Sequence, residues 1–172
     1  DPVIFFESQR VYGETEKFRQ EVPAEYYKIP IGEPDIKRDG QDLTILTVGA
    51  TLYRAIDSAR RLESDYGIST EIIDARSLVP FDYSLVLDSV RKTGRILLAS
   101  DACERGSFLN TLAANIQQMA FDHLDAPVTV VGARNWITPS AEQEDLFFPS
   151  DEWLLDAIHT HLLPLEGYTP SS

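Results

Sequence analysis

The sequence predicts an α/β fold with three layers, in which helices cover both faces of a doubly wound, mostly parallel sheet. Three observations predict it. Short apolar runs rich in β-branched residues alternate with amphipathic helical patterns along most of the chain. The connections between them are short, which favours right-handed crossovers between parallel strands. Two of the runs are almost continuously apolar, as is typical of strands buried on both faces.

Four strands are expected in this sheet. They cover residues 43–48, 71–75, 95–99 and 128–132. The first and third carry the nearly continuous apolar runs. A further apolar run at residues 3–6 is expected to be either an edge strand of the same sheet or the last strand of a domain that precedes it.

The first two helices are predicted from apolar residues at helical spacing. One runs from Leu52 to Leu62, and Gly67 follows at the position of a C-terminal cap. The next begins after Asp82, which is a good N-cap residue, and ends before Gly94. Both helices therefore have a start or stop signal as well as an apolar face.

Two more helices complete the pattern. The third has Ser107 as its expected N-cap and ends before Pro127. The last begins after Ser150, with the acidic pair at residues 151–152 in its first turn, where the helix dipole favours negative charge. It is expected to stop before Pro164.

The chain is expected to divide into three parts. Residues 1–42 are predicted to form an irregular connecting arm that is the end of a missing upstream domain, because prolines and charges interrupt them. Residues 43–165 form the α/β domain, and residues 166–172 a frayed tail. The chain begins with Asp1 rather than Met, so we expect a fragment or a processed product.

Composition excludes several classes of function. The formal net charge is -13, and residues 101–172 hold eleven acidic side chains against two basic ones, Arg105 and Arg134. This argues against a nucleic-acid partner and favours either simple solubility or docking of a basic protein. No stretch approaches the ~20 apolar residues that span a bilayer. The single cysteine, Cys103, is typical of the bacterial cytoplasm or an equivalent reducing compartment.

No local motif predicts catalysis, metal binding or cofactor binding by this chain. His159 and His161 lie two apart on a predicted helix and so do not share a face, and His123 is isolated. The turn after the first strand has one glycine, whereas a dinucleotide fingerprint needs three. At the end of the second strand, Asp74 and Arg76 are expected to pair with each other or across an interface, and an ion pair that only fixes the strand exit is an equal alternative.

Several strings together resemble the beta subunit of thiamine-diphosphate-dependent 2-oxo acid dehydrogenases of the pyruvate and branched-chain type. Their order and spread over almost the whole chain match its C-terminal, transketolase-type domain. The strings are DPVIFFE (1–7), YKIPIG (27–32), IDARSLVPFD (73–82), SVRKTGR (89–95) and LDAPV (124–128).

The resemblance implies that the chemistry lies elsewhere. In this family thiamine diphosphate with Mg²⁺ is held between domains absent from this chain, so the fragment alone is expected to be inactive and to bind no cofactor. The implied partners are the dehydrogenase alpha portion, a second beta copy and the basic subunit-binding domain of the acyltransferase, in a homo- or hetero-oligomer. Asp125, which matches the acidic position of the LDAPV string, and Asp122 are the predicted docking residues. Asp74, Arg76 and Pro80 are expected to be structural.

Departures from the family pattern leave alternatives open. The family often has His-Glu-Ala and a Gly-Gly turn where this chain has SDA (100–102) and GS (106–107), so the role of that histidine is not carried over. The stretch from Trp136 to Pro149 is more similar to branches in which alpha and beta subunits are fused. The alternatives are the C-terminal domain of a transketolase or deoxyxylulose-phosphate-synthase-like enzyme, or a free-standing binding module that uses the strand-end crevice.

Overall fold

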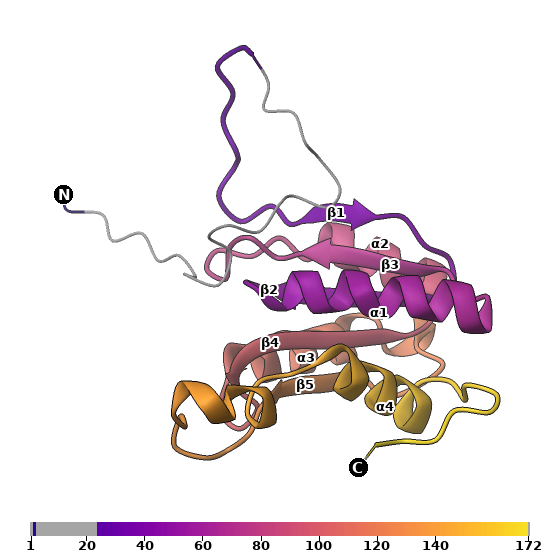
Figure 1. The fold of residues 1–172 in the computed structure, drawn as a ribbon. Coiled ribbons are helices and arrows are strands. Elements are labelled where there is room, and N and C mark those ends of the chain that lie inside the picture. The colour runs from indigo at the N-terminus through magenta and orange to yellow at the C-terminus, as the bar shows by residue number, and fades with distance from the viewer. Residues whose placement is uncertain (1, 3–23, 172) are drawn as a thin grey trace.

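The computed structural model describes residue 2 and residues 24–171, and within them one mixed sheet lies between two layers of helices (Figure 1). The strand order is β1-β3-β2-β4-β5. The strands are β1 (Asp35–Arg38), β2 (Leu43–Val48), β3 (Thr70–Asp74), β4 (Ile96–Cys103) and β5 (Thr129–Ala133). The helices are α1 (Thr51–Tyr66), α2 (Ser84–Thr93), α3 (Phe108–Met119) and α4 (Asp151–His161), with short 3₁₀ helices η2 (Phe121–His123) and η3 (Ala141–Leu146).

The parallel centre of the sheet confirms the predicted fold class. β2 pairs in parallel with β3 on one side and with β4 on the other, and β4 pairs in parallel with β5. Side chains alternate between two cores: Leu43 and Ile45 pack under α1 and α4, whereas Leu46 packs with α2 and α3. Figure 1 shows α1 and α4 on one face and α2 and α3 on the other, which gives the three expected layers.

The expected helix ends are largely as the sequence predicts. Gly67 and Gly94 end α1 and α2 in the left-handed conformation, and each donates its backbone N–H to a carbonyl of the preceding turn. Ser150 caps α4 by accepting the N–H of Trp153 at 3.3 Å. Asp82 accepts the N–H of Ser84 at 2.9 Å, so it caps α2 from one residue before the geometric cap position.

The expectation of an irregular segment up to residue 42 is wrong for β1. Asp35–Arg38 pairs antiparallel with β3 at the edge of the sheet, with Ile36 opposite Ile73. Its sequence, DIKR, has no apolar run because an edge strand exposes much of its surface and charged residues discourage further pairing. The apolar run at residues 3–6 lies outside the described residues.

The tail is also more ordered than a frayed end. Asp156 in α4 is 9% exposed, and its carboxylate accepts the hydroxyl of Tyr168 at 2.6 Å and the N–H of Ser171 at 3.1 Å. The Ser171 hydroxyl donates to the second oxygen at 2.7 Å. One buried carboxylate thus ties the last described residues to α4, a contact that the local sequence pattern does not reveal. No helix in the described part of the chain is long and apolar enough to cross a bilayer.

Candidate functional site

The predicted docking residue Asp125 lies in the turn between η2 and β5. Its backbone N–H donates to the carbonyl of Gly94 at 2.8 Å, and its carboxylate lies 3.3 Å from the Arg95 guanidinium. Arg95 in turn donates through Nε to the carbonyl of Leu162 after α4. The Asp125 side chain is nevertheless 59% exposed. These contacts hold Asp125 in place, while more than half of its side chain remains exposed to a partner.

Asp122 lies in the short helix η2, just before Asp125 in the sequence. It lies in that single 3₁₀ turn and is exposed, as is the neighbouring His123. The structure thus puts both predicted docking acids on the surface at the amino-terminal end of β5. Their contact with a partner remains a prediction.

The strand-end residues Asp74 and Arg76 interact through the backbone rather than as an ion pair. The N–H of Arg76 donates to Asp74 Oδ1 at 3.1 Å, and the Arg76 guanidinium pairs with Asp35 of β1 at 2.9 Å. Asp35 also pairs with Lys37 at 3.1 Å. Burial raises the pKa of Asp74, and the hydrogen bond from Arg76 and the charge of Lys37 partly oppose that shift. This cluster fixes β1 against the end of β3.

Pro80 lies in the loop that follows this cluster. The Val79–Pro80 peptide bond is cis, and the ring packs over Gly32, where an added Cβ would lie 3.2 Å from the ring. The N–H of Asp82 donates to the Gly32 carbonyl at 2.8 Å. Pro80 thus joins the loop after β3 to the segment before β1.

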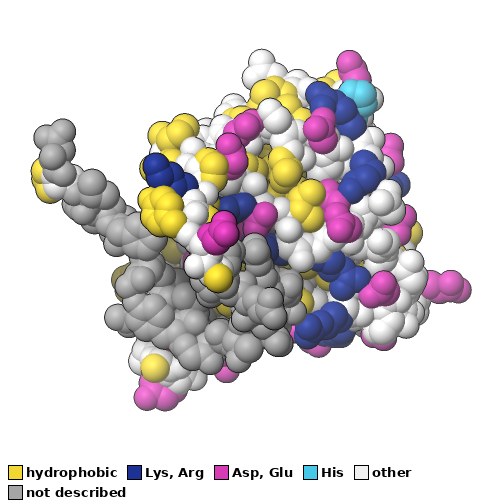
Figure 2. Space-filling view, turned by 90° about the horizontal axis from the view of Figure 1, so that it is seen from above, with side chains coloured by type: hydrophobic (Ala, Val, Ile, Leu, Met, Phe, Trp, Pro, Cys, Tyr) yellow, Lys and Arg dark blue, Asp and Glu magenta, His cyan; other side chains and the backbone are white. Residues whose placement is uncertain are grey.

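Large apolar side chains are exposed around this junction. Figure 2 looks onto this side of the molecule, where apolar side chains lie among acidic and basic ones. An exposed group of this size is typical of a surface that a neighbouring domain or subunit covers. Its members are Tyr26 (87% exposed), Tyr27, Ile29, Ile31 (78%), Ile36, Leu78 and Val79 (78%).

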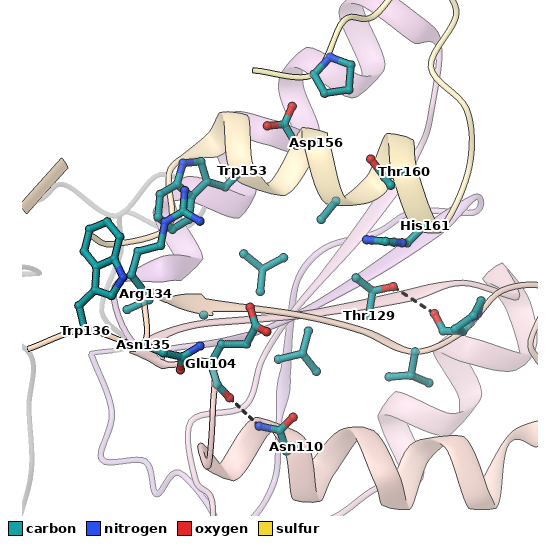
Figure 3. A pocket seen from close by; sticks show the side chains of 18 residues that line it. Glu104, Asn110, Thr129, Arg134, Asn135, Trp136, Trp153, Asp156, Thr160 and His161 are labelled. Atoms are coloured by element: carbon teal, nitrogen blue, oxygen red, sulfur yellow. Dashed lines mark hydrogen bonds between the residues drawn. The ribbon is translucent and has the colours of Figure 1, made fainter. Parts of the chain in front are cut away.

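A groove of about 930 Å³ runs along the outer edge of β5, and no sequence motif predicts it. α4 forms one wall through Trp153, Ala157 and Thr160, and Asn110 of α3 lies on the other side (Figure 3). Arg134 directly follows β5, and its guanidinium carbon lies 4.1 Å from the Trp153 ring centre. Tertiary structure creates this groove because nothing in the described chain pairs with β5 on that side.

A smaller hollow of about 370 Å³ lies at the carboxyl end of β2, where open α/β sheets commonly bind ligands. Its lining includes Arg54 but also four acids, so it disfavours an anionic diphosphate. The acids are Asp57, Asp101, Glu144 and Asp145. In the described part of the chain, no group of three or more His, Cys, Asp or Glu side chains could hold a metal ion.

The position at which this sequence departs from the family pattern lies beside that hollow. Ser100 Oγ accepts the N–H of Ala102 at 3.2 Å, and Asp101 lines the hollow. His159 accepts the N–H of Leu165 at 2.9 Å through Nδ1. Cys103 is half-buried at the end of β4.

Comparison with known proteins gives consistent matches over most of the chain. The model of the family described as "Transketolase, C-terminal domain" matches residues 32–153. The pyruvate dehydrogenase E1 component subunit beta of Bacillus subtilis is 37% identical over 156 residues, which cover 91% of this chain and 47% of that protein. The 2-oxoisovalerate dehydrogenase subunit beta of the same organism is 40% identical over 128 residues, covering 74% and 38%. The chain thus spans about half the length of these relatives.

A solved structure shows the same fold. It is described as "Split gene transketolase, inactive beta4 tetramer" and aligns with a TM-score of 0.57 at 25% identity. The alignment covers 72% of this chain and 40% of that one.

Proposed function

The chain belongs to the family of transketolase C-terminal domains, and from this premise we propose that it is the assembly domain of a 2-oxo acid dehydrogenase component. The complete enzyme would decarboxylate pyruvate, a branched 2-oxo acid or a similar substrate. With thiamine diphosphate and Mg²⁺ it would pass the acyl group to a lipoyl arm. The observation that carries the proposal is the 37% identity to a pyruvate dehydrogenase beta subunit over 91% of the chain.

The geometry supports a structural rather than a chemical role for this part. Contacts within the chain occupy the end of β3, where Asp35, Asp74 and Arg76 interact. The hollow beside β2 is lined by four acids and one arginine, and this excess of negative charge does not fit the diphosphate of the coenzyme. Thiamine diphosphate and Mg²⁺ would therefore be held by other parts of the enzyme, and we assign no step of the reaction to residues of this chain.

Three partners follow from the proposal. The upstream domain or the dehydrogenase alpha portion would cover the exposed apolar side chains around Tyr26, Ile31 and Val79. A second copy of the beta portion completes the enzyme. The basic subunit-binding domain of the acyltransferase docks at Asp125 and Asp122. Relatives from Bacillus subtilis favour a bacterial cytoplasm as the compartment.

Docking at Asp125 is tested by charge reversal. Asp125→Lys should weaken binding to a purified basic subunit-binding domain by about tenfold or more, because it places like charges together. Asp125→Asn should have a smaller effect in the same direction. Asp88→Lys is the matched control, since Asp88 is also an exposed acid paired with an arginine, Arg91. Equal affinities of the Asp125 and Asp88 variants, measured by calorimetry, would remove the docking assignment.

The scaffold role is tested with the coenzyme. Titration of this chain with thiamine diphosphate and Mg²⁺ should give no heat of binding, and the chain should not turn over a 2-oxo acid. Tight coenzyme binding without a companion would contradict the proposal. A transketolase-like enzyme differs in that its C-terminal domain should not bind the basic acyltransferase domain at all.

A further inference from the structure

Arg134 is one of only two basic side chains in the acid-rich residues 101–172, and its charge is unused. Its guanidinium carbon lies 4.1 Å from the ring centre of Trp153 and 6.0 Å from that of Trp136. Figure 3 shows the guanidinium between the two rings, at one end of the groove along β5. Within the described part of the chain it makes no ion pair and no side-chain hydrogen bond. Because stacking uses the faces of the guanidinium, its N–H edge stays open to a bidentate acceptor such as a carboxylate.

Glu104 brings an unused negative charge to the same groove. Its N–H donates to the carbonyl of Ala133 at 3.0 Å, which fixes its backbone beside the end of β5. A Cβ on Gly132 would lie 2.7 Å from Glu104 Cα, so only glycine allows this close approach. The Glu104 side chain is exposed and pairs with no cation among the described residues. Figure 3 shows it reaching into the groove.

The two unused charges are separated by about the length of a small molecule. Arg134 follows Gly132 by two residues, which is roughly 7 Å along an extended backbone. Glu104 lies directly against Gly132. These two described side chains nevertheless form no ion pair, since stacking on Trp153 holds the guanidinium. An arginine and a glutamate that line one groove without pairing are complementary to a ligand that carries both a carboxylate and an ammonium group.

The rest of the groove disfavours other classes of ligand. Asp156, the second acid in its lining, already accepts three hydrogen bonds from the tail. One unused arginine on a chain with a net charge of -13 is too little for a multiply charged anion such as a nucleotide. The lining also includes Val128, Val130 and Ala157, which can pack against an apolar group. A ligand without net charge and with an apolar part therefore fits this groove best.

We propose that the groove binds a free α-amino acid with an apolar side chain. The carboxylate accepts two N–H groups of Arg134, the ammonium group donates to Glu104, and the side chain packs against Ala157 and the tryptophan rings. Such a zwitterion meets no long-range repulsion from the negative chain. The site lies wholly within this chain and goes beyond the proposed function, because its ligand is neither the coenzyme nor the 2-oxo acid.

L-Leucine is the probe for this site. Trp136 and Trp153 are the only two tryptophans of the sequence, so bound leucine should change the intrinsic tryptophan fluorescence in a saturable way. Arg134→Met keeps an apolar contact with Trp153 but removes the carboxylate donors. It should weaken leucine binding, measured by calorimetry, by about tenfold or more. Arg105→Met is the matched control and should leave the affinity unchanged, since Arg105 is the other arginine of residues 101–172 and does not line the groove.

Two analogues of leucine test the two charges separately. Isocaproate is leucine without its amino group, and isopentylamine is leucine without its carboxylate. Each should bind the parent chain about tenfold or more weakly than leucine does. Glu104→Gln should weaken the binding of leucine but not that of isocaproate, because only leucine has an ammonium group.

Three results would overturn the proposal. They are no saturable response to leucine up to ~10 mM, equal leucine affinities of the parent and a folded Arg134→Met variant, and equal affinities of the parent for leucine and isocaproate. None of them affects the proposed function. That function fails instead if the basic acyltransferase domain does not bind or if the chain alone binds the coenzyme.

Discussion

Gly94 and Gly67 both end helices in the left-handed conformation, with φ of 69° and 67°, but their surroundings differ. An added Cβ at Gly67 would meet nothing within 4 Å, whereas at Gly94 it would lie 2.5 Å from an Asp125 carboxylate oxygen. We expect Gly67→Ala to cost about 1 kcal/mol, from backbone strain alone. Gly94→Ala should cost about 2–3 kcal/mol, because the Asp125 side chain must move as well. Urea denaturation of the two variants measures the difference in their free energies of unfolding. Equal losses of stability would show that the Asp125 side chain moves away from the added Cβ without a measurable cost.

Asp74 and Asp82 should give opposite pH dependences. Burial raises the pKa of Asp74, so the stability it contributes is present at low pH and is lost as pH rises through the folded pKa. Hydrogen bonds from Ser84 lower the pKa of Asp82, so its contribution is present above the unfolded pKa and is lost as pH falls. Relative to the parent, Asp74→Asn should gain stability from about pH 3 to about pH 7, and Asp82→Asn should lose it. Denaturation at several pH values checks both signs, and parallel curves for the two variants would contradict the assignment.

At the scale of elements, one buried charge joins β3 to α2. Glu71 in β3 is 1% exposed, pairs with Lys92 of α2, and also lies 3.4 Å from the N–H of Gly40. Lys92→Ala should cost about 2–4 kcal/mol, because it leaves a buried carboxylate without its cation. Arg91→Ala is the neighbouring control: its exposed pair with Asp88 should be worth less than about 1 kcal/mol. Thermal unfolding distinguishes the two, and equal losses would mean that water solvates Glu71 after the change.

At the scale of the whole molecule, the proposed docking site should be sensitive to salt. Added salt screens the attraction between a basic domain and the acids Asp125 and Asp122, so docking should weaken as the salt concentration rises. Calorimetry from about 0.05 M to about 0.3 M NaCl measures this trend. An affinity that stays constant over this range would show that charge does not hold the basic domain at this site.

The sequence alone determined the parts that depend on neighbours within a few residues. Periodicity identified β2 to β5 and the four α-helices, and Gly67, Gly94 and Ser150 marked helix ends because caps act within one turn. The ordered strings also predicted the family, which the match over residues 32–153 confirms. Substrate, coenzyme and docking partner remain predictions from that membership.

Only the tertiary structure decided which strands lie at the edges and what lies opposite them. The sequence pattern did not predict β1, because a charged edge strand has no apolar periodicity. Arg76 pairs with Asp35 only because β1 lies beside β3. The groove along β5 has the same origin. Its residues carry no motif, and it exists because strand order leaves β5 without an outer neighbour while α3 and α4 flank it. Side-chain patterns predict elements, but the contacts between distant segments depend on how those elements are ordered in space.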